Sequence, residues 1–225
     1  SSAASDVYKR QSPGSANACG GTMAILKTAG RMADRMQIGT GVKFALGENP
    51  KSVYNDRDET PITRMATAAM IREGLAKAQR YQQELDFAES DPDEHMPDYD
   101  AKSEALLPLL ERDVKAHFHC HRADDICTAI RIAKEFNLVY VIIHGTEGHL
   151  IADILAEENA PVIAGPILCD RCKPEMQHLT ISGPSIMQKA GVKLALCTDH
   201  PVIPIQYLPT TAALAVKGGM QREDA

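Results

Sequence analysis

Short apolar runs alternate with amphipathic segments along most of the chain, and this alternation predicts strands followed by helices. The apolar runs lie at residues 41–46, 113–119, 138–143, 161–164 and 193–197. The segments with helical spacing of apolar positions lie at residues 61–81, 124–136, 151–155, 184–190 and 209–216. Successive strand–helix units with strands that are apolar throughout are typical of a parallel sheet covered on both faces. The pattern therefore predicts an α/β fold.

The glycines narrow the choice among parallel α/β folds. No glycine-rich dinucleotide fingerprint follows any of the predicted strands, which removes the support for a nucleotide-binding doubly wound sheet. A parallel barrel remains the favoured architecture. Barrels of this kind carry their catalytic groups at the carboxyl ends of the strands.

Three features mark where the elements begin and where the alternation stops. Residues 1–11 are small, polar and aperiodic, and they are interpreted as a non-native or disordered tail that precedes a domain at 12–225. Thr60, followed by Pro61, is the predicted N-cap of the first helix. Residues 84–100 hold 8 acidic side chains and neither lysine nor arginine. That composition predicts a solvated acidic loop.

Composition and charge limit the classes of function. The 225 residues carry 24 basic and 30 acidic side chains, a net charge of −6, which argues against a nucleic-acid partner. No apolar run approaches the roughly 18 residues of a membrane span, and no signal peptide is visible. Six cysteines are too few for a disulfide scaffold. A cytoplasmic enzyme with a small-molecule substrate is expected, with homo-oligomerisation left open.

Histidines gather where the predicted strands end. Those at or just after a strand exit are His117, His119, His121, His144, His149 and His200, six of the eight in the chain. Alternation along a strand places the first three on one side, which in a barrel can be the inside. Imidazole and carboxylate groups from separate strands are ligands that Zn²⁺ or Mn²⁺ prefers. His121 and His149 are equally compatible with surface or capping roles.

Three segments resemble a known family in their order and spacing. These are His-Cys-His-Arg-Ala-Asp-Asp at 119–125, Val-Ile-Ile-His-Gly-Thr-Glu-Gly-His at 141–149 and Cys-Thr-Asp-His-Pro at 197–201. They are similar to strands five, six and eight of the amidohydrolase superfamily, and the nearest branch is the imidazolonepropionase-related hydrolases. The resemblance extends from about residue 12 to residue 225. It implies a (β/α)8 TIM-type barrel that hydrolyses C–N bonds of amides or cyclic amides, other than peptide bonds, with a metal-activated water.

The resemblance also implies roles for individual residues. His119 and His144 would be the metal ligands of strands five and six, and Asp199 the carboxylate of strand eight, both ligand and proton acceptor. Lys43 occupies the position at which some members carry a carboxylated lysine that bridges two metals. The residues that would contact the substrate are His121, Arg122, His149 and His200. Zinc is the expected metal, with manganese or iron as alternatives.

The sequence departs from the family in its first half. Members carry a His-x-His pair on the first strand, but residues 1–94 contain no histidine. The small β-sandwich that the family builds from both termini is also missing. The expectation is a fragment that covers about strands four to eight of the barrel. A barrel that cannot close leaves exposed sheet edges, so this chain alone is expected to be inactive and poorly soluble.

Other interpretations compete at several of these positions. The spacing of Cys169 and Cys172 suits a redox dithiol or half of a zinc site, so a non-catalytic metal-binding or thiol-redox protein is the alternative function. Asp124, Asp125 and Glu147 are equally compatible with acids that favour the first turn of a helix. Lys43 has the alternative of a strand lysine that extends to the surface.

Overall fold

A single seven-stranded sheet forms the centre of the computed structural model, which describes residues 8–91 and 93–225. Its strands follow one another in chain order and are β1 (Tyr8–Gln11), β2 (Cys19–Lys27), β3 (Gln37–Ala45), β4 (Lys115–Cys120), β5 (Tyr140–His144), β6 (Val162–Ala164) and β7 (Leu194–Leu196). The pairs β1–β2 and β2–β3 are antiparallel, whereas β3 to β7 are mutually parallel. The predicted run of parallel strands is therefore confirmed.

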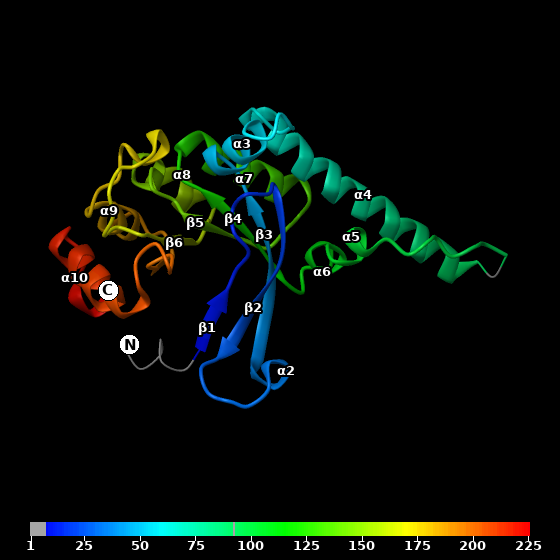
Figure 1. Cartoon of the computed structure of the whole chain (residues 1–225), viewed down its shortest axis with the longest axis horizontal. Coiled ribbons are helices and arrows are strands. Elements are labelled where there is room, and N and C mark those ends of the chain that lie inside the picture. The colour runs from blue at the N-terminus through cyan, green and yellow to red at the C-terminus, as the bar shows by residue number, and fades with distance from the viewer. Residues whose placement is uncertain (1–7, 92) are drawn as a thin grey trace.

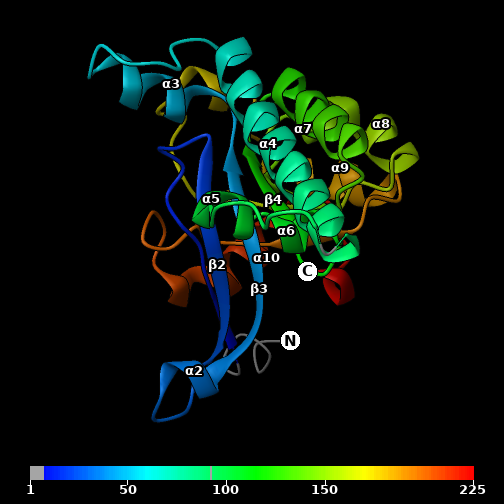
Figure 2. The ribbon, with the colours of Figure 1, turned by 90° about the vertical axis from the view of Figure 1, so that its right-hand side faces the viewer.

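Helices connect the parallel strands. The α-helices are α2 (Ala33–Met36), α3 (Glu48–Asn55), α4 (Arg64–Ser90), α5 (Ala101–Glu104), α6 (Leu107–Leu110), α7 (Ala123–Glu135), α8 (Ala152–Glu157), α9 (Gly183–Lys189) and α10 (Leu208–Lys217). Short 3₁₀ turns are η1 (Gly148–Ile151), η2 (Pro174–Met176), η3 (Ile205–Tyr207) and η4 (Arg222–Asp224). Figure 2 shows α4, α7, α8 and α9 together on one side of the parallel strands. Within the described residues, no helix is long and apolar enough to cross a membrane.

Alternation along the strands separates the core from the cavity. Phe44 of β3 and Phe118 of β4 are register partners whose rings stack with centroids 5.2 Å apart, and both are fully buried in the main core cluster with the helices. Their neighbours Lys43, His117 and His119 lie on the opposite face, where they line a cavity. The helices thus cover one face of the parallel strands, and the other face carries polar groups.

The long helix α4 corrects two predictions. It begins at Arg64 and not after Thr60, because the hydroxyl of Thr63 accepts a hydrogen bond from the backbone N–H of Ala66 at 3.0 Å. It also continues to Ser90, so the first part of the predicted acidic loop is helical. Residues 82–90 contain neither glycine nor proline and include good helix formers, so nothing ends the helix at Tyr81.

The first strands lie in a region that the apolar pattern does not mark. Residues 8–11 of the predicted tail form β1 on β2, whereas residues 1–7 lie outside the described part of the chain. The ladder of β2 and β3 shifts register between Cys19 and Gly21, and Gly21 has φ of 101°. A glycine at such a bulge interrupts the alternation by which a strand is recognised. The β2–β3 ribbon extends away from the helices that cover the parallel strands, and the short helix α2 lies at its far end (Figure 1).

Candidate metal centre

A cavity of about 2220 Å³ opens on the polar face of the sheet. Its wall combines strand residues with the loops that follow the strands, and it includes Lys43, Asn49, His117, His119, His121, His144, Cys169, Lys173, Asp199 and His200. Five of these residues lie at or shortly after the carboxyl ends of parallel strands, which meet at one edge of the sheet: His119, His121, His144, Asp199 and His200. This is the edge at which the sequence predicts chemistry.

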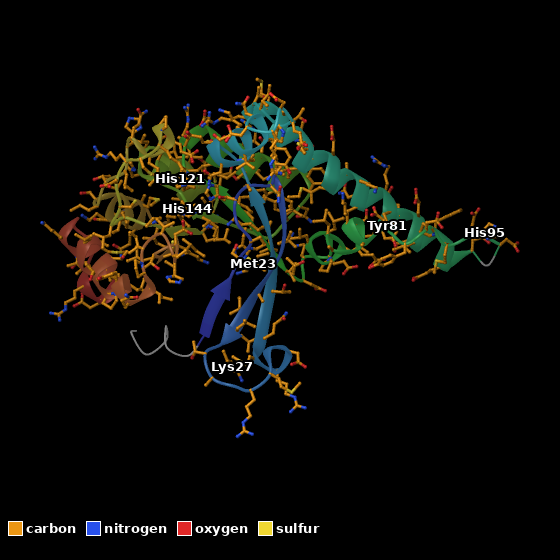
Figure 3. The ribbon with its side chains drawn as sticks, viewed as in Figure 1. Met23, Lys27, Tyr81, His95, His121 and His144 are labelled. Carbon is orange, nitrogen blue, oxygen red and sulfur yellow. The ribbon has the colours of Figure 1, made fainter. Side chains whose placement is uncertain are left out.

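Three buried histidines meet in this cavity. His119 is in β4, His121 follows β4 by one residue, and His144 is the last residue of the adjacent β5. Ring nitrogens of the three lie within 4.8 Å of one another, and the ring centroids are separated by 4.6 to 5.0 Å. Figure 3 shows His121 and His144 close together in this region. The sequence-based prediction that separate strand exits converge is correct for these residues.

Each imidazole is oriented by a second polar group. Nδ1 of His144 donates to the carbonyl of Gly165 at 2.6 Å, which leaves Nε2 of His144 as the nitrogen with a lone pair. Nδ1 of His121 lies 2.7 Å from the hydroxyl of Thr146. Nδ2 of Asn49 donates to Nε2 of His119 at 3.2 Å, so in this contact Nε2 is the acceptor. The contacts of His144 and His121 are of the kind that fixes the tautomer and the ring orientation of metal-binding histidines.

Burial keeps the three imidazoles neutral. It is the largest cause that lowers the pKa of His119 and His144, and it lowers the pKa of His121 to about 2. The ammonium groups of Lys43 and Lys173 lower the pKa of His119 and His144 further. A neutral imidazole is the form that binds a metal, so the cluster is in the binding-competent state at neutral pH.

Asp199 lies at the exit of β7, and it differs from the histidines in its exposure. Its side chain is exposed and lines the cavity, and its negative charge opposes the fall in the pKa of His144. The backbone is left-handed at both residues, with φ of 53° at Asp199 and 76° at His144. Non-glycine residues rarely adopt this conformation, and where they do the chain turns sharply. Both strand exits therefore redirect the backbone at the candidate residue.

The remaining predicted site residues divide into two groups. Lys43 is buried in the cavity wall, where its ammonium lies 3.4 Å from the hydroxyl of Ser12 and from the carbonyl of Pro13. It therefore does not extend to the surface. His200 is exposed and lines the cavity. Among the described residues, Arg122 and His149 are not part of the cavity wall.

Arg122 and His149 make local contacts outside the cavity, and so do the nearby acids Asp124 and Glu147. The guanidinium of Arg122 pairs with Asp124 at 2.9 Å, and Nδ1 of His149 lies 3.0 Å from the carbonyl of Thr146. Glu147 accepts the backbone N–H of Ala123 at 2.8 Å, so its carboxylate binds the start of α7 and not its own turn. His178 contacts the other oxygen of Glu147 at 2.7 Å.

Two residues of the cavity wall were not predicted by the sequence. Lys173 donates a hydrogen bond to Asn49, and together they connect the loop after β6 to His119. Their separation in the chain is 124 residues. No local motif marks such a pair, because the contact exists only once the sheet has formed.

The cysteine pair is present in the cavity wall without forming a metal group. Cys169 and Cys172 both line the cavity, and burial raises the pKa of the Cys169 thiol. The Cys169 thiol donates to the carbonyl of Pro166. All six cysteines are free thiols. In the part of the chain that the structure describes, the candidate metal group consists of histidines alone.

Comparisons with known proteins identify relatives of this chain. Over 235 aligned residues, it is 27% identical to Amidohydrolase tasK of Hapsidospora irregularis, across 92% of this chain and 24% of that protein. The crystal structure of an amidohydrolase from Thermotoga maritima MSB8 superposes with a TM-score of 0.90 at 42% identity. Both of these proteins are named as amidohydrolases. No family model matches the chain.

This chain matches only part of the length of each of these two proteins. The alignment to the Thermotoga structure covers 94% of this chain and 56% of that chain. The chain thus spans about a quarter of the curated relative and just over half of the solved structure. The chain is thus similar to amidohydrolases in sequence and in structure, and a histidine group that could hold a metal lies in its cavity.

Proposed function

We propose that this chain is the part of a zinc-dependent amidohydrolase, related to the imidazolonepropionases, that carries metal ligands and the proton shuttle. The observation that carries the proposal is the buried, neutral group of His119, His121 and His144 at the exits of adjacent parallel strands. The amidohydrolase relatives in sequence and structure support the same reaction class. The substrate would be a small molecule with an amide or cyclic amide C–N bond.

The architecture supports a part of a (β/α)8 barrel. Strands β3 to β7 are parallel and in chain order, and helices cover their outer face. On this proposal they correspond to strands four to eight of the barrel. The large cavity on the opposite face would then be the barrel interior. The share of the Thermotoga structure that is matched, 56%, fits a partial barrel.

The donor set fits a divalent transition metal. Imidazole nitrogens are suitable ligands for Zn²⁺ and Fe²⁺, and catalytic zinc sites combine about three protein ligands with an open position for water or substrate. The hydrogen bond from His144 to the Gly165 carbonyl is the outer-shell contact that orients such ligands. When bound, the metal would supply Lewis-acid activation of water and polarisation of the scissile carbonyl.

The side chains of this chain would perform the remaining steps. His119 and His144 would hold the metal from two adjacent strands, with Asp199 as an oxygen ligand from a third. The Asp199 carboxylate would accept the proton of the attacking water and return it to the leaving nitrogen. His121 and His200 line the same cavity and would contact the substrate. Lys43 is buried in the wall, and on this proposal it would be the carboxylated lysine that bridges two metals.

Metal analysis with two variants separates this proposal from the thiol alternative. We expect the purified protein to bind zinc, His144→Ala to lose it, and Cys169→Ser to retain it. Removal of one nitrogen ligand disrupts the site, whereas the Cys169 thiol is held by the Pro166 carbonyl. Loss of zinc in Cys169→Ser with retention in His144→Ala would instead favour a thiol-based metal or redox protein.

A further inference from the structure

Glu175 is a fully buried carboxylate with one unsatisfied oxygen. It lies in η2, in the loop after β6, and 0% of its surface is exposed. Its Oε2 accepts the backbone N–H of Glu48 at 2.8 Å, and the guanidinium of Arg64 lies 4.0 Å from the same oxygen. Its Oε1 is the one buried side-chain polar atom of the described residues without a hydrogen-bond partner. A buried orphan oxygen is costly, so it points to an interaction with a ligand.

The orphan oxygen faces the histidine cluster. Oε1 of Glu175 lies 3.8 Å from Nε2 of His121. This separation is too long for a hydrogen bond. It suits two ligands of one cation, because two donors at about 2.1 Å from a zinc ion are roughly 3.4 Å apart at the tetrahedral angle and farther apart at wider angles. Nδ1 of His121 contacts Thr146, which leaves Nε2 directed to Glu175.

The charges around the cluster favour a carboxylate at this position. The ammonium group of Lys173 acts on the histidines and also on Glu175. An ammonium group beside neutral imidazoles repels a divalent cation unless negative groups offset it. Asp199 supplies one such group from the exposed side of the cavity. Glu175 supplies the second from the buried side.

We propose that Oε1 of Glu175 and Nε2 of His121 bind the metal together, which makes Glu175 a carboxylate ligand and gives His121 a metal-binding role in place of substrate contact. This inference rests on the proposed metal-dependent function and adds a ligand from the loop after β6. The same loop contributes Cys172 and Lys173 to the wall of the cavity, so it would link metal binding to that wall.

A purely structural role of Glu175 makes different predictions. In that case its carboxylate would serve the Glu48 N–H and the Arg64–Asp125 pair, in which Arg64 and Asp125 lie 3.0 Å apart. Glu175→Gln would then destabilise the metal-free protein and leave zinc affinity unchanged. A ligand role predicts the opposite, because the amide removes the charge that the cation requires while its oxygen still accepts from Glu48.

The test measures zinc affinity by competition with a chelator of known affinity, and melting temperature with and without zinc. Glu147→Gln is the matched control, because Glu147 is also buried but both of its oxygens are satisfied by Ala123 and His178. We expect Glu175→Gln to weaken zinc binding by about 10- to 100-fold or more. Its metal-free melting temperature should stay equal or rise, and the stabilisation by zinc should shrink.

The control should give the reverse pattern. Glu147→Gln should lower the metal-free melting temperature and keep zinc affinity within about threefold of wild type. Equal zinc affinity in Glu175→Gln and wild type would overturn the ligand role and leave the proposed function standing. An equal loss of affinity in both variants would also overturn it, because loosening of the loops would then explain the effect. A wild-type protein that binds no zinc would overturn both proposals.

Discussion

The strand exits of β4 and β5 differ from the exit of β7. At β4 and β5, the candidate ligands His119 and His144 are 3% exposed and are held by Asn49 and by the Gly165 carbonyl. At β7, Asp199 is exposed, and the three residues of the strand are only partly covered or exposed. The nitrogen side of the proposed centre is therefore preorganised by packing, whereas the carboxylate side faces an open cavity.

Because of this difference, substitutions at the two kinds of strand exit should affect folding stability and catalysis to different degrees. A residue that is buried and hydrogen-bonded contributes to both, so its substitution gives a mixed effect. An exposed residue with few contacts contributes to chemistry with little effect on folding. The exits of one sheet thus predict two kinds of variant behaviour, which the following experiments can confirm or contradict.

The largest expected effect is on catalysis at the exposed exit. Asp199→Asn in the enzyme that contains this chain should lower turnover by about 10²- to 10⁴-fold, because the amide cannot accept the proton of water. The melting temperature should change little, since the side chain is exposed. Steady-state kinetics and thermal unfolding measure the two quantities. Near-wild-type turnover with any substrate of the intact enzyme would falsify the shuttle.

The next effect contrasts side-chain packing in a central strand of the parallel sheet with packing in its last strand, β7. Phe118→Ala in β4 should lower the free energy of unfolding by about 3–5 kcal/mol, because a fully buried ring that stacks on Phe44 is lost. Leu194→Ala in β7 should cost only about 1 kcal/mol, because Leu194 is half-buried. Urea unfolding measures both. Equal losses in the free energy of unfolding for the two variants would show that β7 is packed as tightly as β4.

The buried exits also predict a dependence of stability on pH. Burial lowers the pKa of His121 to about 2, and it lowers the pKa of His119 and His144. The unfolded chain titrates near 6.5, so below that pH it binds more protons than the folded chain. Stability should therefore fall as the pH drops below about 6.5, by up to about 1.4 kcal/mol per pH unit for each histidine.

Urea unfolding of the metal-free protein between pH 7 and pH 5 measures this dependence. His121→Asn removes one titrating group and should make the fall with pH shallower. An unchanged slope in this variant would show that the unfolded and folded chains protonate His121 alike.

Local patterns predicted the part of the fold that repeats. Apolar runs located β3 to β7, and the residues at their ends located His119 and His144, because strand exits are visible in the sequence. The β1–β2 strands were missed, since the glycine bulge at Gly21 breaks the alternation. The start of α4 was misplaced because Thr60 and Thr63 are both plausible caps and only the tertiary position of the chain selects Thr63.

The candidate site was predictable only where it lies on strands. Glu175 and Lys173 reach the histidines from the loop after β6, and Asn49 reaches them from the first turn of α3. Glu175 contacts Glu48 across 127 positions of sequence. Such contacts depend on how far each loop extends over the end of the sheet. A glutamate in a loop has no periodicity or spacing that distinguishes it from a solvated side chain. Its burial and its orphan oxygen became evident only in three dimensions.

The smallest expected effect concerns the left-handed backbone of Asp199. The φ angle of this residue is 53°, in the left-handed region, which asparagine adopts at a lower free-energy cost than alanine. The free energy of unfolding of Asp199→Ala should therefore be about 1 kcal/mol lower than that of Asp199→Asn. Asp153 is a matched control, because it is exposed and lies in the helix α8. There alanine is the better helix former, so Asp153→Ala should be more stable than Asp153→Asn by about 0.5 kcal/mol. Urea unfolding of the four variants tests this reversal of order. If the alanine variant is the more stable one at both positions, the left-handed backbone at residue 199 is not imposed by the fold. The exit of β7 would then leave both the side chain and the backbone of Asp199 unconstrained.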